Sequence, residues 1–324
     1  MGKKKIAVMT SGGDAPGMNA GIRAVVRTAI YEGLSIFGIY GGYSGLINGD
    51  LMPLNRNSVS NIIQKGGTFL KTSRCETFRH KSGRKRAADM LKEWDIEGLI
   101  VIGGDGSFHG AHYLYEEQGV PVIGVPATID NDIFGTDLTI GYDTAVTTAL
   151  NSIDKIRDTA TSHNRLFIVE VMGRNAGFIA LEVGICGGAE EILVPERKSD
   201  LEKLGDEITT WSKSGKKSSL IVVAEGDDLG NANTIARKVK EKYNIESHVC
   251  VLGHTQRGGS PTATDRVLAS RLGHHAVKQF IAGKEDIMVG WKSNKLNTIP
   301  LPDSWNKKKP LDKDLMELYS ILSS

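Results

Sequence analysis

Short runs of apolar, often β-branched residues recur along the chain, and most of them end in Gly, Asp or Thr. Several runs are almost continuously apolar instead of alternating, a pattern typical of strands that are buried on both faces of a parallel sheet. The predicted strands are Ile6–Met9, Ile36–Tyr40, Leu99–Ile102, Val122–Val125, Leu166–Val171, Leu220–Ala224 and Val249–Leu252.

Helical patterns lie between these strands. Asp14-Ala15-Pro16 is typical of a helix start, and Gly33 supplies the matching stop. Apolar stripes at helical spacing follow further along the chain: Ala87, Leu91 and Trp94; Ala145, Ala149, Ile153 and Ile156; and Leu268, Leu272, Ala276 and Phe280, before Gly283. Alternating strands and helices predict a doubly wound α/β fold, in which ligands bind beyond the C-terminal ends of the strands.

Length and composition narrow the class of protein. A chain of 324 residues favours two domains or one large α/β unit. The net charge of +2 gives no reason to expect a nucleic acid or a membrane surface as partner, and no apolar run approaches 18 residues. Cys75, Cys186 and Cys250 form neither a disulfide framework nor a metal motif, and the apolar run at Ile6 leaves no room for a signal peptide. We therefore expect a cytoplasmic protein.

The 38 glycines cluster at the ends of the apolar runs. After the first run, Thr10-Ser11-Gly12-Gly13-Asp14 places two glycines where a strand turns into a helix. Glycine there lets backbone N–H groups approach an anion at the helix start. A tight turn without a ligand is the alternative interpretation.

A second glycine cluster, Gly103-Gly104-Asp105-Gly106-Ser107, surrounds one carboxylate. This arrangement suits a phosphate chain with its Mg²⁺, which prefers one or two carboxylates together with phosphate oxygens. A glycine-rich turn capped by Asp105 is the alternative. A dinucleotide-binding loop fits less well because the glycine spacing misses GxGxxG by one residue, and the Walker A pattern is absent from the chain.

The third strand-end motif is Thr128-Ile129-Asp130-Asn131-Asp132. Two carboxylates at i and i+2 beside a hydroxyl repel each other unless a cation or a proton transfer uses them. One could be the base for a substrate hydroxyl, and the other could tune that base or help to hold the metal. The alternative is a surface turn rich in Asx residues.

Arginines and glycines follow two later strands, in Met172-Gly173-Arg174 and in His254-Thr255-Gln256-Arg257-Gly258-Gly259, and Arg165 begins the strand before Met172. A single arginine at a strand end is usually solvated or ion-paired. Several beside glycines indicate a phosphosugar site, because guanidinium groups match phosphate oxygens in a bidentate way.

In combination these motifs resemble the bacterial-type ATP-dependent 6-phosphofructokinases. The resemblance reaches from the N-terminus to about Gly290 and rests on TSGGDAPGMNA from Thr10, GGTF from Gly66, IGGDGS from Ile102, ATIDND from Ala127, MGRNAG from Met172 and GHTQRGGSPT from Gly253. It implies two doubly wound, mainly parallel-sheet domains, each a Rossmann-like three-layer sandwich, with the active site in the cleft between them. The ATP-binding domain would comprise residues 1–141 and about 260–306, and the fructose 6-phosphate domain residues 142–259 and about 307–324.

The resemblance also implies the reaction, MgATP phosphorylating fructose 6-phosphate to fructose 1,6-bisphosphate, the committed step of glycolysis. Asp130 would be the general base, with Thr128 and Asp132 beside it, Arg174 would stabilise the transferring phosphoryl group, and Gly13 completes the catalytic set. The implied ATP-binding residues are Gly13, Arg74, Cys75, Gly104, Asp105, Gly106 and Ser107, with Asp105 serving Mg²⁺. The implied sugar-phosphate residues are Thr128, Ile129, Asp130, Arg165, Met172, Gly173, Arg174, Glu225, His254, Thr255, Gln256 and Arg257.

Arg165 matches a residue that reaches in from a neighbouring subunit, which implies a homotetramer. An effector site for ADP or phosphoenolpyruvate is implied at Arg23, Arg27, Arg56, Arg157, Gly188, Ala189, Glu190, Lys216, Lys217 and Ser218. Small residues at Gly106 and Ala127, where pyrophosphate-dependent relatives carry Asp and Lys, favour ATP as the donor. His248, Ser214 and Asn61 depart from the family pattern and predict weaker fructose 6-phosphate binding and a muted or altered effector response.

Two other functions share some of these features. A NAD or lipid kinase would share the GGDG loop but does not require the ATIDND, MGR and QRGGSP motifs together. A sugar-phosphate sensor that has lost catalysis would keep the fold, yet Asp105, Asp130 and Arg174 are all present, which argues against such a loss.

Overall fold

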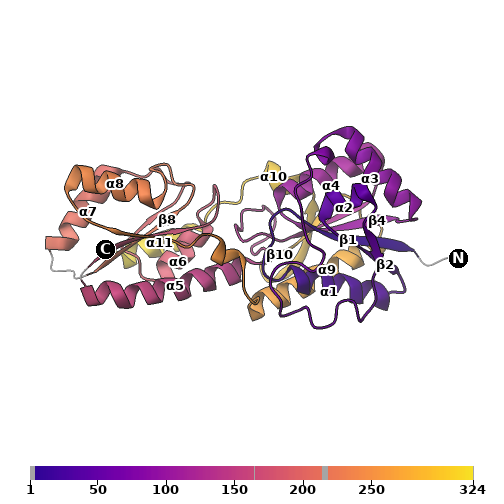
Figure 1. Cartoon of the computed structure of the whole chain (residues 1–324), viewed down its shortest axis with the longest axis horizontal. Coiled ribbons are helices and arrows are strands. Elements are labelled where there is room, and N and C mark those ends of the chain that lie inside the picture. Colours follow the sequence, from indigo (N-terminus) through magenta and orange to yellow (C-terminus); the bar gives the residue numbers. More distant parts are fainter. Residues whose placement is uncertain (1–3, 164, 214–217, 324) are drawn as a thin grey trace. The chain divides into compact units, whose positions relative to one another are not determined.

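The computed structural model describes residues 4–163, 165–213 and 218–323. The chain divides into two compact units (Figure 1), the first made of Met1–Ile129, Ile133–Thr144 and Arg257–Lys309, the second of Asp130–Asp132, Ala145–Gln256 and Pro310–Ser324. Each unit is an α/β structure built on a mainly parallel sheet, which confirms the predicted fold class. Each predicted strand is present, with its ends displaced by at most two residues.

The sheet of the first unit has seven strands in the order β11-β10-β5-β4-β1-β2-β3. The inner five strands run parallel, and the two edge strands, β3 and β11, are antiparallel to their neighbours. The strands are β1 (Lys5–Ser11), β2 (Ser35–Ile39), β3 (Leu51–Pro53), β4 (Gly98–Gly103), β5 (Val122–Pro126), β10 (Ile287–Lys292) and β11 (Lys295–Pro300). Every residue of β4 and β5 is buried, as the continuous apolar runs predict.

Helices cover both faces of this sheet. Figure 1 shows α1 (Met18–Tyr31) and α9 (Ala263–Ile281) together on one face, and α2 (Gly42–Asn48), α3 (Lys81–Glu93) and α4 (Asp105–Gln118) on the other. The short elements η1 (Thr77–Arg79) and α10 (Asp303–Asn306) complete this unit.

The start of α1 differs from the sequence prediction. The helix begins at Met18 and not near Asp14, because Gly17 at its N-cap has a φ of 104°. A side chain on Gly17 would place Cβ 2.8 Å from Ile140, so glycine is required there both by conformation and by space. The predicted stop is confirmed, since Gly33 follows the helix with a φ of 78°.

The second unit has four parallel strands in the order β7-β8-β6-β9. They are β6 (Leu166–Val171), β7 (Glu191–Leu193), β8 (Ser219–Ala224) and β9 (His248–Val251). Figure 1 shows α7 (Leu201–Lys213) and α8 (Ala232–Tyr243) over one face, and α5 (Tyr142–His163), α6 (Phe178–Cys186) and α11 (Lys313–Leu322) over the other. The element η2 (Gly253–Arg257) follows β9.

The C-terminal helix α11 docks on the second unit through Tyr319, which is 4% exposed. Its hydroxyl accepts a hydrogen bond from the Ile192 backbone N–H at 3.0 Å and lies 3.2 Å from the backbone oxygen of Glu190. This residue therefore ties the end of the chain to the segment that enters β7.

Asp265 is a fully buried carboxylate in the first unit. It accepts hydrogen bonds from the backbone N–H groups of Gly141 and Thr144, both at 2.8 Å, and from the Thr144 hydroxyl at 2.5 Å. These bonds fix the start of α5 against α9. Burial raises the pKa of Asp265 to about 6, against the lowering effect of its hydrogen bonds.

We predict that Asp265→Asn changes the pH dependence of stability. Because the folded-state pKa lies above the ordinary value, the aspartate contributes less to stability once it ionises in the folded protein. Wild-type stability relative to the variant should therefore fall as pH rises from about 4 to about 6, by up to ~3 kcal/mol. Chemical unfolding at several pH values measures this difference. Asp154→Asn, an exposed position on α5, is the control, and a difference that stays constant from pH 4 to 7 contradicts the prediction.

Candidate active site

Two loops of the first unit approach each other beyond β1 and β4. The strands are parallel neighbours with Ser11 paired to Gly103, so their following loops lie at the same edge of the sheet. A side chain on Gly103 would place Cβ 2.6 Å from the Ser11 backbone oxygen, and one on Gly12 would lie 3.1 Å from Ser107 Oγ. Gly12 also has a φ of 86°. Glycine is therefore the residue that allows this contact between the loops.

The N-terminus of α4 lies in the second loop. Its N-cap, Gly104, supplies no side-chain cap, so the first backbone N–H groups of a 14-residue helix are available to an anion. A side chain on Gly106 would meet no atom within 4 Å, so the space beside it is open. The predicted phosphate loop thus has an uncapped helix start with open space beside it.

Asp105 is the acidic residue of this first helical turn, and its side chain is 54% exposed. The His109 ring lies one turn along the helix, with Nε2 3.6 Å from Asp105 Oδ1. Within the described ranges, no three His, Cys, Asp or Glu side chains are grouped so as to hold a metal ion. A single carboxylate at a helix start suits Mg²⁺ only as part of a complex in which a phosphate chain supplies further ligands.

The segment that carries Arg74 and Cys75 is fastened to the end of β1. The Thr10 hydroxyl donates to the Lys71 backbone oxygen at 2.9 Å, and the Thr72 hydroxyl donates to the Gly12 backbone oxygen at 2.8 Å. Arg74 follows directly and is exposed, while Cys75 is partly buried. The structure therefore brings these predicted nucleotide residues to the Gly12 loop.

Arg257 lies against Gly13. Its Nη1 would be 2.4 Å from any Cβ at position 13, and it donates to the Asp14 backbone oxygen at 3.3 Å. A residue predicted for the sugar phosphate thus touches a residue predicted for ATP. Thr128, after β5, lies near Gly104, since a Cβ at position 104 would be 3.7 Å from Thr128 Cβ.

Asp130 and Arg174 are paired in the second unit. Asp130 is 3% exposed, and its Oδ2 lies 3.7 Å from Arg174 Nε. Arg174 itself is a non-glycine residue with a φ of 53°, a conformation that costs free energy and indicates a constrained position. Its backbone N–H donates to Glu225 Oε1 at 2.7 Å, so Glu225 fixes this strained residue.

The surrounding backbone leaves no room for side chains at two glycines. A Cβ on Gly173 would lie 2.4 Å from the Ala176 backbone oxygen, and one on Gly226 would lie 2.0 Å from the Arg174 backbone oxygen. Gly173 also has a φ of 144°. The loop after β8 is therefore in close contact with the backbone of the loop after β6, at Arg174.

The remaining predicted sugar residues divide by position. Because β8, β6 and β9 are adjacent and parallel, the segments after them share one edge of the sheet, and they contain Glu225, Met172–Arg174 and His254–Gln256. Gln256 is fully buried and its amide donates to the Gly253 backbone oxygen at 3.2 Å, so its side chain is not exposed to a ligand. The Ile129 side chain is also buried, whereas Asp132 is exposed. Arg165 precedes β6 and lies at the opposite edge, away from the others.

The predicted effector residues lie in both units. Arg23 and Arg27 are one turn apart on α1 of the first unit, and Arg56 is exposed after β3. In the second unit, Arg157 donates to the backbone oxygens of Gly187 and Gly188 and lies 3.8 Å from Glu190. Ala189 is buried and Ser218 precedes β8. Lys216 and Lys217, and the departure at Ser214, lie outside the described residues.

Known proteins identify the family. The phosphofructokinase family model matches residues 5–280. The chain belongs to the phosphofructokinase family. It is 52% identical to proteins named ATP-dependent 6-phosphofructokinase from Halothermothrix orenii and ATP-dependent 6-phosphofructokinase 1 from Thermus thermophilus, over 99% of this chain and 99% of each relative. The predicted resemblance is thereby confirmed.

Solved phosphofructokinase structures share the fold. The phosphofructokinase of Saccharomyces cerevisiae matches with a TM-score of 0.88 and 37% identity over 99% of this chain, which spans 47% of the length of that yeast chain. A pyrophosphate-dependent phosphofructokinase from Marinobacter aquaeolei matches with a TM-score of 0.86 at 23% identity, covering 92% of that chain, and shows the fold alone. Among the described residues of this phosphofructokinase-family chain, no helix has the length and apolar character needed to cross a membrane.

Asp265 was missed by the sequence analysis, although it orders the segment after the ATIDND motif. A signal for it exists, because Thr262 and Asp265 have the spacing of a helix-capping pair, and the Thr262 hydroxyl does cap α9 by accepting the Asp265 N–H. The contact between two of the quoted motifs was also missed. The Asn19 side chain, within TSGGDAPGMNA, accepts from the Phe69 N–H at 2.6 Å and thereby holds the GGTF segment.

We predict that Gly13→Ala impairs the activity that gives the relatives their name. The new methyl group would displace the Arg257 guanidinium, and a shift of about 1 Å at a reacting site can cost about a hundredfold in rate. Steady-state phosphorylation of fructose 6-phosphate by ATP measures the loss. The same change in an Arg257→Ala background is the control, because the clash is absent there. If the two substitutions act additively, the contact between Gly13 and Arg257 does not cause the loss.

Proposed function

We propose that this protein is an ATP-dependent 6-phosphofructokinase that transfers the γ-phosphoryl group of MgATP to the 1-hydroxyl of fructose 6-phosphate. The observation that carries the proposal is the pair of Asp130 and Arg174, in which a nearly buried carboxylate lies 3.7 Å from a guanidinium. Glu225 fixes the Arg174 backbone by accepting its N–H. The relatives of 52% identity, which are named for this reaction, support it over the full chain.

The first unit would bind the phosphoryl donor. The free N–H groups at the start of α4 and the loop at Gly12 and Gly13 suit the phosphate chain of ATP. Asp105 would hold Mg²⁺ together with phosphate oxygens, and the bound Mg²⁺ would neutralise charge on the phosphates. Arg74 and Cys75 would contact the nucleotide beyond the phosphates, because the hydrogen bonds of Thr10 and Thr72 bring their segment to the same loop.

Asp130 would act as the base for the acceptor. The sugar 1-oxygen attacks the γ-phosphorus, its proton passes to the Asp130 carboxylate, and ADP leaves with the electron pair of the broken P–O bond. Phosphoryl transfer through a loose transition state depends more on orientation than on basicity, so an ordinary carboxylate suffices when it is fixed. Arg174 would stabilise the negative charge on the transferring group, and a cation in this role can contribute about 10³–10⁵ in rate.

The donor proposal is ATP and not pyrophosphate. The open space beside Gly106, where a Cβ would meet nothing within 4 Å, supports room for the rest of the nucleotide. Ala127, which is 1% exposed, likewise presents no cationic side chain next to Thr128. A NAD or lipid kinase would share the GGDG loop but provides no reason for the Asp130–Arg174 pair.

Arg23 and Arg27 support an anionic effector such as ADP or phosphoenolpyruvate. The two residues carry like charges one helical turn apart. Burial and the charge of Arg27 lower the pKa of Arg23. The buried Arg27 Nε has no hydrogen-bond partner in the described part of the chain. An anion between them would relieve the repulsion.

Arg165 lies at the edge of its sheet opposite the other sugar residues, which supports the proposal that it serves another subunit of a homotetramer. The proposed location is the cytoplasm.

We predict that Asp130→Asn lowers kcat by about 10²–10⁴-fold while the apparent KM for fructose 6-phosphate changes far less, because a base acts on the transition state and not on binding. The assay tests each phosphoryl donor, ATP or pyrophosphate, with each acceptor, fructose 6-phosphate or NAD. Fructose 1,6-bisphosphate should form only when ATP and fructose 6-phosphate are supplied together. Asp89→Asn, an exposed change on α3, is the matched control. Equal losses in both variants, or turnover of NAD, would exclude the proposed roles.

We also predict that His248→Arg lowers the apparent KM for fructose 6-phosphate. His248 is exposed on the edge strand β9 but packs on Phe167 of its own unit, with ring centroids 5.3 Å apart, so it reaches outward less than an arginine would. The longer, permanently charged side chain can bind a phosphate in a bidentate way. Saturation curves of the two proteins at fixed MgATP measure the shift, with His248→Gln as the control for loss of the ring. An unchanged KM in the arginine variant would rule out this role for position 248.

A further inference from the structure

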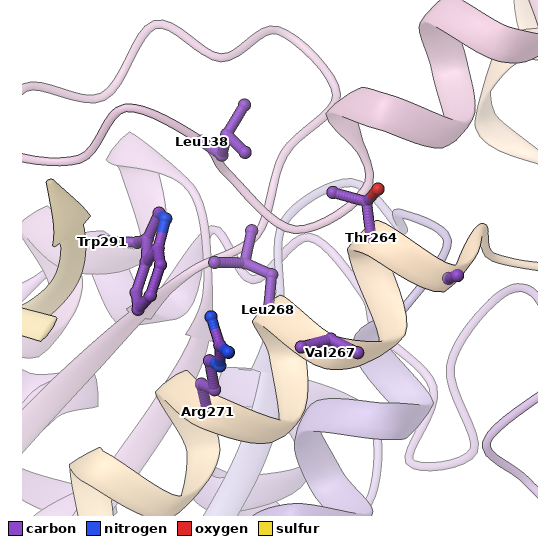
Figure 2. Close-up of a pocket in the computed structure, with 7 residues that line it drawn as sticks. Leu138, Thr264, Val267, Leu268, Arg271 and Trp291 are labelled. Atoms are coloured by element: carbon purple, nitrogen blue, oxygen red, sulfur yellow. The ribbon is translucent and has the colours of Figure 1, made fainter. Parts of the chain in front are cut away.

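A cavity of about 300 Å³ lies in the first unit, and none of the residues predicted for catalysis, ATP or effector lines it (Figure 2). It lies between the N-terminal half of α9, the loop before α5 and the end of β10. Its lining consists of Leu138, Ala263, Thr264, Val267, Leu268, Arg271 and Trp291. The volume is at the lower end of the range of about 300–1,000 Å³ that small-molecule sites occupy.

Two walls of the cavity are fixed to each other by Thr136. Its hydroxyl donates to the Leu138 backbone oxygen at 2.7 Å and accepts from the Trp291 backbone N–H at 3.1 Å. The Asp137 N–H adds a bond to the Trp291 backbone oxygen at 2.7 Å. Because these bonds are made within the chain itself, they hold the walls in place, and a site whose walls are fixed loses little affinity to rearrangement.

The lining is apolar apart from one cation and one hydroxyl. Figure 2 shows Leu268 rising from α9 toward Leu138, with Val267 farther along the helix surface. Leu268 is 5% exposed and Val267 is 50% exposed, so the cavity has a closed apolar floor and an open side. An apolar body of a ligand could therefore replace water there with a gain from the hydrophobic effect.

Arg271 provides the cation. Its guanidinium carbon lies 4.6 Å from the centre of the Trp291 ring, and Figure 2 shows the guanidinium directed toward that ring. Stacking on an indole uses the flat face of the guanidinium and leaves the N–H groups at its edge available. In the chain as described, no carboxylate forms an ion pair with Arg271. Arg271 is exposed, and its charge beside this apolar cavity is not neutralised by a carboxylate of the described residues.

We propose that this cavity binds a small monocarboxylate with a branched aliphatic or aromatic body. The carboxylate would pair with the edge of the Arg271 guanidinium, which matches its geometry in a bidentate way, and the apolar body would pack on Leu138 and Leu268. A phosphate ester carries up to two charges, and the single cation of this lining would leave one of them unpaired beside apolar side chains. One cation in an apolar lining therefore fits a monoanion best.

Calorimetry and ligand-observed NMR on the full chain test the proposal with phenylacetate, isovalerate, phenylacetamide and phenyl phosphate as probes. We expect both carboxylates to bind the wild type, the neutral amide and the phosphate ester to bind at least about tenfold more weakly, and Arg271→Gln to weaken carboxylate binding by about tenfold or more. Arg237→Gln, an exposed arginine change on α8, is the matched control and should leave binding unchanged. Val267→Phe, which fills the open side and keeps the charge, should also abolish binding.

Several results would overturn the proposal. These are no carboxylate binding by the wild type, equal binding by Arg271→Gln, or binding of phenylacetamide or phenyl phosphate as tight as that of phenylacetate. Sedimentation of each variant is measured alongside. If Arg271→Gln changes the oligomeric state while no probe binds, this surface is a contact between copies of the chain and not a ligand site. The outcome is independent of the proposed kinase activity, which is assayed separately.

Discussion

Close approach of backbone to backbone at the strand ends is the constraint on which the candidate site depends. In the first unit, Gly103 lies so near the Ser11 backbone oxygen that a Cβ would be 2.6 Å away. In the second, Gly226 leaves only 2.0 Å between such a Cβ and the Arg174 backbone oxygen. Parallel neighbours bring two loops to one edge of a sheet, and glycine lets them touch. Side chains larger than a hydrogen would separate the loops and move the functional groups with them.

The loops that are fixed in this way carry charged side chains that remain accessible to ligands. Asp105 is half exposed at a helix start, where the helix dipole already favours an anion. Arg174 keeps its side chain 66% exposed, although its backbone is held by Glu225 in a strained conformation. The free energy that strain costs is offset by hydrogen bonds and packing elsewhere in the unit. A site ordered before binding spends little of its binding energy on rearrangement, which suits a reaction that depends on orientation.

The sequence predicted the strands well because strands that are buried on both faces of a parallel sheet appear in it as runs without polar residues. It predicted the glycine motifs for a related reason, since few residues satisfy positive φ and close approach together. It was less successful where the decisive contact comes from far along the chain. The start of α1 was placed near Asp14, but the N-cap is Gly17, where a side chain would clash with Ile140, more than 100 residues later. Likewise, the burial of Gln256 and the hydrogen bonds of Asp265 to Gly141 and Thr144 depend on tertiary packing between segments that are far apart in the sequence.

The segment that follows the ATIDND motif links several of these features within the first unit. Thr139 donates to the Thr128 backbone oxygen at 2.7 Å, Thr136 fastens Leu138 to Trp291, and Asp265 holds Gly141 and Thr144. One side of this segment thus supports Thr128, and the other forms a wall of the cavity beside Arg271. Because Thr139 and Leu138 are adjacent, a ligand that packs on Leu138 would contact a segment bonded directly to the backbone of Thr128. Such a ligand would affect turnover only if it bound one conformational state of this segment more tightly than another. A ligand with equal affinity for the two states would not change their populations.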